Sequence, residues 1–450
     1  MRRIFGVELR RSNAPTLLAL LIGAGIAGLA LGGNLGLGTW HLFAYIHSSS
    51  MFLLLPLALA GGAVLGRREK RTRAAELFAS TGRPTAHRLL PGLLALGVAV
   101  AVGHLLVYAG GAIWILASGT YTTAVTVLWP LTGVLVLAGG AWMGLAAGRA
   151  WSSPLVPPMV AVLGLLLQFG FAEIGPPGEP SYLENLSMLA QPPIYAWEAV
   201  TGRALLGYAV FGAGLIGAGF LLAAGRSWLP RVAAVVLLGV AGSIAAIVPG
   251  KTADTHYRVD AGAQKLVCTD GAPQVCVIAA HRQLLDEAAP QVREALTLLA
   301  KLPGGQTRAV EWRADEVYKP GESDWQSTGT TRPEPGTVNF DLGVTRGKIG
   351  PALTENVLLA AGTLWNGCEG GQDLVAAHAV AAWLLGKDEL TGVDDGLSYF
   401  PDLQKQVPET VRGLRALPEK EQIRRVAAVR DASLACQEDL LPILTGKASS

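Results

Sequence analysis

Seven long apolar stretches between residues 14 and 248 constrain the fold of this chain more than any other feature. Each stretch, as a helix, is about long enough to cross a hydrocarbon layer of roughly 30 Å. They predict a polytopic α-helical membrane domain with about seven transmembrane helices. The expected spans are Ala14–Gly33, Ser49–Gly66, Leu90–Leu116, Ala124–Gly148, Pro157–Ile174, Leu205–Ala224 and Pro230–Val248.

The positive charges of this half fall almost entirely into every second connection between the stretches, with Arg203 as the exception. They are Arg2, Arg3, Arg10 and Arg11, then Arg67, Arg68, Lys70, Arg71, Arg73, Arg83 and Arg88, then Arg149, and finally Arg226 and Arg231. Helices buried in a soluble core would not sort their arginines in this way. By the positive-inside rule, the N-terminus lies in the cytoplasm, and seven crossings place the chain after Pro249 outside. We therefore expect a multi-pass protein of the cell membrane.

The part after Pro249 has the composition of a soluble domain. The whole chain is 16% charged, whereas soluble proteins are about a quarter charged. We expect a membrane domain over residues 1–249 and a small extracytoplasmic α+β domain over residues 250–450. The expected strands are Lys265–Cys268, Val275–Ile278, Thr307–Arg313 and Thr337–Leu342, and the expected helices are Arg282–Leu302, Leu353–Trp365, Asp373–Leu385 and Glu419–Leu440. Two short surface helices are expected before the sixth span, at Tyr182–Leu189 and Ile194–Val200.

All four cysteines lie in this second domain, which fits an oxidising exterior and two disulfides. Four cysteines allow three pairings, of which we favour Cys268–Cys276 across a hairpin and Cys368–Cys436 between helices. A metal site is not expected, because the cysteine spacing lacks C-x-x-C and the three histidines stand far apart in the sequence. These histidines are His256, His281 and His378.

No catalytic motif is present in the second domain, which lacks H-E-x-x-H, G-x-S-x-G and S-x-x-K. We expect it to cap an exit, bind a ligand or meet a partner in the cell envelope, and the sequence does not choose among these.

Glycine patterns in the spans indicate helix packing rather than nucleotide binding. Two G-x-G-x-x-G matches, Gly23–Gly28 and Gly212–Gly217, lack the preceding strand and the acidic residue of a dinucleotide site. The four-residue spacing of Gly140, Gly144 and Gly148 predicts a seam between helices, either within one bundle or between two copies. No ATPase site and no cofactor site are recognised.

Few polar residues lie at membrane depth. They are His104, Gln168 and Glu173, the last expected near the outer surface. Ionisable groups inside a membrane are candidates for function. For His104 two interpretations stay open, which are a role in transport and a hydrogen bond to a neighbouring helix.

The connection over residues 67–88 is the most distinctive local segment. Ala74–Ala79 predicts a short basic helix, which Ser80-Thr81-Gly82-Arg83-Pro84 ends with turn residues. With the N-terminal helix Val7–Arg11, the order Glu76-Leu77, Ala79-Ser80-Thr81 and Arg83 resembles the membrane subunits of ABC-2 type exporters, in the version that has an added extracytoplasmic domain.

The resemblance implies a homodimeric permease that moves a substrate with energy from a separate ATPase subunit. That subunit would dock on the N-terminal helix and on the loop after the second span. The residues expected at or near the contact are Glu8, Arg10, Arg73, Glu76, Ser80, Thr81 and Arg83. The chain departs from the family pattern at Gly82, where proline is common, and in having seven spans instead of six. No nucleic-acid partner is expected.

Two other hypotheses remain. The chain is alternatively a membrane-anchored extracytoplasmic protein that binds or senses a ligand, and a membrane enzyme is the weaker third hypothesis. The basic inner loop favours the exporter, because an anchor needs only one span.

Reporter fusions test the topology. A reporter that is active only outside the cytoplasm should be active after Pro249 and inactive at Thr72, because an odd number of predicted spans separates the two sites. The opposite activity at either position would contradict the predicted orientation.

Overall fold

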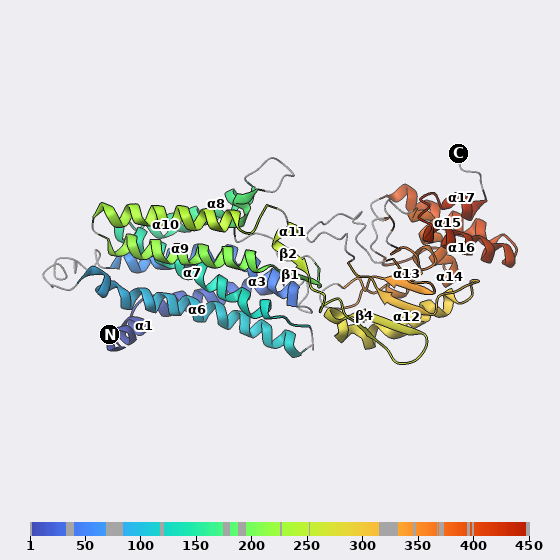
Figure 1. Ribbon diagram of the computed structural model, residues 1–450, viewed down its shortest axis with the longest axis horizontal. Coiled ribbons are helices and arrows are strands. Elements are labelled where there is room, and N and C mark those ends of the chain that lie inside the picture. The colour runs from blue at the N-terminus through green and yellow to red at the C-terminus, as the bar shows by residue number, and fades with distance from the viewer. Residues whose placement is uncertain are drawn as a thin grey trace. The chain divides into compact units, whose positions relative to one another are not determined.

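The computed structural model describes residues 2–32, 40–68, 84–117, 121–173, 181–187, 195–225, 227–251, 253–314, 332–344, 348–366, 368, 373–393, 397 and 400–446. The chain divides into two compact units. Residues 1–118 and 122–258 form the first, and residues 119–121 and 259–450 form the second. The first unit is almost entirely helical, and the second combines helices with a four-stranded sheet (Figure 1).

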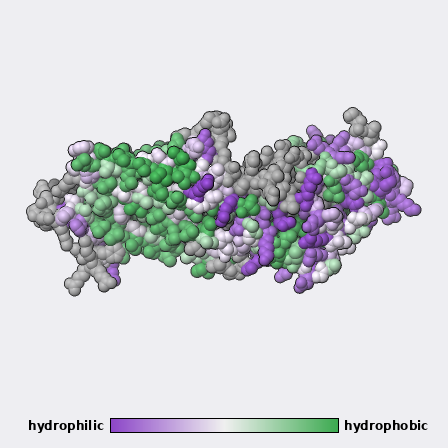
Figure 2. Space-filling view, viewed as in Figure 1, coloured by the Kyte–Doolittle hydropathy of each residue, from purple (hydrophilic) through white to green (hydrophobic). Residues whose placement is uncertain are grey.

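The first unit has a helix at every position where the sequence predicts a span. These helices are α2 (Ala14–Gly32), α3 (Trp40–Gly66), α6 (Thr85–Ala117), α7 (Ala124–Ala150), α8 (Val156–Glu173), α9 (Gly202–Ala224) and α10 (Trp228–Ile247). In the described part of the chain, six of them are long and apolar enough to cross a membrane, and α8 is the shorter exception. Hydrophobic residues cover most of the face of this unit that Figure 2 shows, as expected for a surface that contacts lipid.

Helix α3 begins nine residues before the predicted span, at Trp40 instead of Ser49. The added residues are held by aromatic contacts with α6. The Phe43 ring lies 5.0 Å from that of Tyr108 between centroids, and Trp40 lies 6.3 Å from the same ring. This tertiary packing extends helix α3 to include His47 and Ser48. Hydropathy alone excludes these two residues from the span because their side chains are polar.

One further prediction in this region is wrong, and one helix of the second unit was missed. The segment Ile194–Val200 was expected to be helical, but Glu198–Val200 forms a strand, β1, which pairs with β2 (Tyr257–Val259). A hydrogen bond from the Thr201 amide to the His256 carbonyl extends this pairing. In the second unit, helix α15 (Pro401–Arg415) was not predicted at all.

Helix α7 packs most extensively against α9 and α3. Glycines bring the α3 and α7 backbones into contact, because a Cβ added at Gly144 would overlap the Leu59 carbonyl oxygen of α3. One turn further along, a Cβ at Gly148 would overlap the Ala63 carbonyl oxygen. The predicted glycine seam therefore lies inside one bundle, where small residues allow close van der Waals contact.

The second G-x-G-x-x-G match has the same explanation. A Cβ at Gly212 would overlap α7, and a Cβ at Gly214 or Gly217 would overlap side chains of α10. These glycines of α9 allow close packing against α7 on one side and α10 on the other. Helix packing therefore explains why their spacing matches the nucleotide-binding pattern.

Alanine substitutions distinguish this seam from incidental glycine. Gly144→Ala should destabilise the folded protein by about 1–3 kcal/mol, because the helices must separate to admit the methyl group. Gly239→Ala on α10 should be neutral or slightly stabilising, since no described atom beyond its own stretch of helix lies within 4 Å of the added Cβ and alanine is the better helix former. Thermal unfolding of the full-length protein in detergent measures both, and equal effects would contradict the α3–α7 contact.

The sheet of the second unit has the order β3-β4-β5-β6. Its strands are β3 (Leu266–Cys268), β4 (Gln274–Ile278), β5 (Arg308–Glu311) and β6 (Thr337–Phe340). Strands β3 and β4 form the predicted antiparallel hairpin, whereas β4, β5 and β6 are parallel. The three parallel strands therefore end at one edge of the sheet, and the residues that follow them lie close together.

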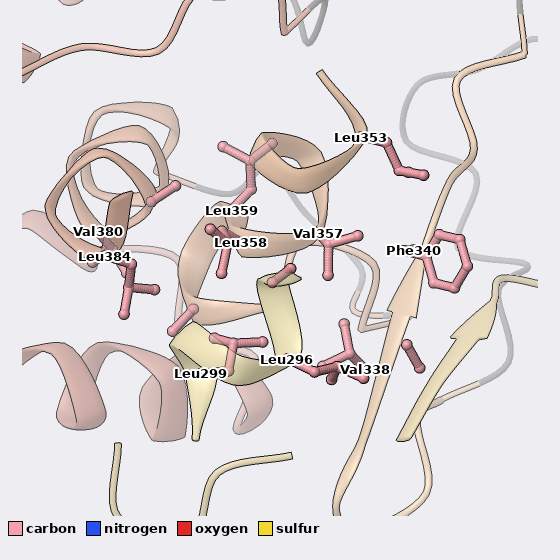
Figure 3. Close-up of a cluster of buried hydrophobic side chains, with 14 of the residues drawn as sticks. Leu296, Leu299, Val338, Phe340, Leu353, Val357, Leu358, Leu359, Val380 and Leu384 are labelled. Carbon is pink, nitrogen blue, oxygen red and sulfur yellow. The ribbon is translucent and has the colours of Figure 1, made fainter. Parts of the chain in front are cut away.

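Helices cover this sheet and enclose an apolar core. They are α12 (Leu285–Leu299), α13 (Leu353–Leu358), α14 (Leu374–Leu385), α15, α16 (Glu419–Leu434) and α17 (Leu441–Thr445). Figure 3 shows Leu296 and Leu299 of α12 between Val338 of β6 and the side chains of α13 and α14. Asp373 caps α14 by accepting a hydrogen bond from the Ala376 amide, and Gly386 ends it in the left-handed conformation.

The cysteines of this unit form the two pairs that the sequence analysis favoured. The sulfurs of Cys268 and Cys276 are 2.07 Å apart across the β3–β4 hairpin, and those of Cys368 and Cys436 are 1.94 Å apart. The second pair joins segments 68 residues apart in the sequence. Two disulfides fit a domain in an oxidising compartment.

Candidate functional site

The N-terminal part of the expected ATPase contact lies on α1 (Arg2–Arg11), which packs against α6 and α2. Glu8 accepts a charge-assisted hydrogen bond of 3.1 Å from Arg68, just beyond the end of α3, and Arg10 is exposed. Figure 1 shows α1 at the end of the bundle that also holds the α9–α10 connection. The remaining predicted contact residues lie outside the described residues, and they are Arg73, Glu76, Ser80, Thr81 and Arg83.

A second arginine joins helix ends on this face. The Arg67 Nε donates a hydrogen bond of 3.0 Å to the Ser152 carbonyl, in the connection after α7. Arg67 and Arg68 thus tie the end of α3 to α7 and to α1, respectively. Residues 69–83, which follow directly, lead from this junction to the start of α6.

Inside the helical unit, residues of α3, α6, α7 and α9 line a cavity. About 30 Å³ of it is open to the centres of water molecules, whereas one water needs roughly 10–15 Å³. The lining residues are His47, Ser48, Met51, His104, Trp129, Pro130, Thr132, Gly133, Val136 and Tyr208. None of these ten described residues is Asp, Glu, Lys or Arg.

The central polar element of this cavity is a pair of imidazoles. The Nε2 atoms of His47 and His104 are 3.2 Å apart, and the ring centroids are 4.5 Å apart. Both residues are only 2% exposed. Among the described residues, neither Nδ1 atom has a hydrogen-bond partner. The two rings therefore pair through Nε2, each Nδ1 is enclosed by protein, and the Pro130 backbone carbonyl also lies within reach of the His104 ring.

The rest of the cavity wall is aromatic and comes mainly from α7 and α9. The Trp129 indole N–H donates to the Ser48 hydroxyl, and its ring lies edge-on to Tyr208 with centroids 5.4 Å apart. A Cβ added at Gly133 would lie 2.7 Å from the His104 Nε2. Glycine at position 133 therefore leaves room for the His104 ring in the position that it occupies.

The sequence identified His104 but not its partner. His47 lies outside the predicted second span, and 57 residues separate the two histidines. Gln168, also identified from the sequence, is 3% exposed on α8, and its amide has no hydrogen-bond partner among the described residues. It is not one of the residues that line the cavity, so the structure does not bring it together with the histidines.

The second unit contains a buried polar group at the carboxyl ends of its parallel strands. The His281 Nδ1 is hydrogen-bonded to the Glu311 carboxylate, whose other oxygen accepts a 2.8 Å hydrogen bond from the Ile278 amide. Asp341 directly follows β6 at the same edge. His281, isolated in the sequence, is therefore paired, and the register of parallel strands supplies its partner.

These charges change the proton affinities of the group. Burial alone would lower the pKa of His281, but the charge and hydrogen bond of Glu311 outweigh it, and the pKa is raised. Burial raises the pKa of Asp341, and the nearby Glu311 charge raises it further. Among the described residues, no three His, Cys, Asp or Glu side chains are placed to hold a metal ion.

Comparison with known proteins identifies no relative of this chain. No protein-family model, no curated protein and no solved structure matches it. The function must therefore be argued from its own residues.

The His281–Glu311 pair makes stability depend on pH. Because folding raises the His281 pKa, the folded protein retains a proton that the unfolded chain releases above pH of about 6.5. The contribution of this bound proton to the free energy of unfolding is complete below pH of about 6.5. It is lost as the pH rises through the raised pKa of His281 in the folded protein. Asp341, whose pKa is also raised, acts in the same direction.

We expect the unfolding temperature of the second unit to fall as pH rises from 6 to 9, and His281→Gln to flatten that dependence. The exposed His87 on α6 provides the control, since His87→Gln should leave the slope unchanged. Calorimetry of the full-length protein in detergent measures the slopes. An unchanged slope in the His281→Gln variant would show that the pair does not control it.

Proposed function

We propose that this chain is the membrane subunit of an exporter, which moves a substrate across the cell membrane with energy from a separate ATPase subunit. The observation that supports this best is the charged junction formed by α1, the end of α3 and the connection after α7. The expected docking segment Arg73–Arg83 lies in the connection over residues 69–83, which runs from Arg68 of this junction to the start of α6. Both ends of that segment therefore belong to the face that carries α1.

The orientation follows from the same charges. The positive-inside rule assigns one end of each of the helices α3, α7 and α10 to the cytoplasm. The arginines at these ends are Arg67 and Arg68 for α3, Arg149 for α7 and Arg231 for α10. Helix α8, the fifth of these helices along the chain, brings the number of spans to seven, since its 18 residues extend about 27 Å. Apolar side chains such as Met159 and Leu166, 64% and 60% exposed, suit contact with lipid. Seven spans place the disulfide-bonded domain outside.

The docking segment connects the two helices that carry the histidine pair. His47 lies on α3 and His104 on α6, and residues 69–83 join these helices. A force applied by an ATPase at this segment would act on α3 and α6 together, and a small shift of one against the other would alter the 3.2 Å contact. This arrangement provides a physical route from ATP hydrolysis to the cavity. We propose that the permease acts as a homodimer, as the resemblance implies.

Charge reversal in the docking segment tests the proposal. Glu76→Arg should weaken ATPase binding by about tenfold or more, because like charges across an interface are strongly unfavourable. Insertion should be unaffected, since the spans are untouched. Glu409→Arg, on the exposed surface of α15, is the matched control. The measurements are co-purification of an ATPase subunit with this chain and substrate-stimulated ATP hydrolysis by the reconstituted complex.

If Glu76→Arg and a scrambled Arg73–Arg83 segment both left ATPase binding and transport intact, the exporter proposal would lose its basis. The membrane-anchored binding or sensing protein would then become the better hypothesis.

A further inference from the structure

We propose that His47 and Met51 of α3, together with His104 of α6, form a binding site for a soft monovalent metal ion, namely Cu(I). The site is argued from contacts inside the helical unit alone. It rests on the proposed function in one respect, which is that the bound ion is the substrate that the exporter moves.

The two imidazoles bring together the nitrogen atoms that would bind the ion. The Nε2 atoms of His47 and His104 are 3.2 Å apart. Two nitrogens that bind one ion at about 2.0–2.1 Å, with a tetrahedral angle between the bonds, are about 3.4 Å apart. The rings therefore need to separate by only about 0.2 Å to hold one ion between them.

Binding changes only the position of a proton. Without an ion, one Nε2 donates a hydrogen bond to the other. With an ion, both Nε2 atoms are ligands, so each ring carries its proton on Nδ1. A backbone carbonyl is a common partner for the second nitrogen of a ligating histidine, and the Pro130 carbonyl lies within reach of the His104 ring.

Met51 supplies a third donor from the same helix as His47. The two residues are four positions apart on α3, so their side chains lie on one face of the helix. Both residues line the cavity that His104 also lines, and Met51 is only 4% exposed. Thioether sulfur is a soft ligand that selects Cu(I), and imidazole also binds copper. The donor set therefore matches this ion.

The cavity has the size of an ion and not of a bulky ligand. About 30 Å³ of it is open to the centres of water molecules, whereas one water needs roughly 10–15 Å³. A metal ion without its hydration shell occupies no more room than a water molecule. The space beside the two rings therefore suffices for the ion.

The wall of the cavity selects the charge of the ion. None of the ten lining residues is Asp, Glu, Lys or Arg. A divalent ion such as Zn²⁺ would bring two uncompensated charges into a low-dielectric site, and the cost of burial rises with the square of the charge. Cu(I) brings only one charge. The rings of Phe43 and Tyr108, 5.9 Å and 5.0 Å from the His47 ring between centroids, complete a water-poor shell that favours the copper ion of lower charge.

Copper binding to the full-length protein in lipid nanodiscs tests the site without any ATPase. Ascorbate keeps the copper reduced and the disulfides intact, and all four cysteines form disulfides, so no thiol competes for the ion. Competition with a colour-forming Cu(I) chelator measures stoichiometry and affinity. X-ray absorption at the copper edge identifies the ligand atoms, and Zn²⁺ is the divalent probe.

We expect one Cu(I) per chain, with two nitrogens at about 2.0 Å and one sulfur at about 2.3 Å. His104→Gln should weaken binding at least about tenfold, because one ligand is lost. Met51→Leu nearly conserves the side-chain volume, and it should weaken binding and remove the sulfur signal. The matched controls are His87→Gln, exposed on α6, and Met159→Leu, 64% exposed on α8, which should bind Cu(I) like the unaltered protein.

Three results would overturn the proposal. They are copper that stays with the chelator, an absorption spectrum without imidazole nitrogen, and Zn²⁺ that displaces Cu(I) at equal concentration. The first two are recorded on the unaltered protein, so they do not depend on the folding of any variant. The exporter proposal fails separately, when Glu76→Arg leaves ATPase docking intact, and that failure would not affect copper binding.

Discussion

Close backbone contact between α7 and its neighbours α3 and α9 is the interaction on which the helical unit depends. In lipid, apolar side chains gain little by leaving one apolar environment for another, so helices associate through van der Waals packing and a few polar contacts. Gly144 admits the α3 backbone and Gly212 admits the α7 backbone. Because α7 is held this closely, Trp129 reaches the Ser48 hydroxyl, and Gly133 lies against the His104 ring. The cavity is thus a consequence of the packing that stabilises the bundle.

Most helix positions in this unit could be predicted from the sequence because hydropathy is local. A run of apolar residues specifies a membrane helix regardless of what it contacts. The prediction failed where a distant contact decided the outcome. Helix α3 extends back to Trp40 because its aromatic residues pack on Tyr108 of α6. Likewise, Glu198–Val200 is a strand only because Tyr257–Val259 lies beside it.

The polar pairs were less accessible to prediction than the elements that carry them. His104 stood out because it interrupts an apolar run, but nothing in the sequence indicates that His47 opposes it from another helix. In the second unit, Glu311 lies 30 residues after His281. Only the parallel register of β4, β5 and β6 brings the ends of these strands together. Alternation and propensity identify strands, whereas strand order and register depend on contacts between them.

The two histidine sites differ in the one property that their surroundings impose. His281 is buried beside two carboxylates, so it is stabilised with its proton bound. The His47–His104 pair has no acidic neighbour in its cavity, and a buried charge inside a membrane is expensive. Histidine therefore forms a pH-dependent contact between strand ends in the sheet domain and a hydrogen-bonded pair between helices in the bundle. Because the pair bridges α3 and α6, any motion that separates these helices also breaks the 3.2 Å contact between the two rings.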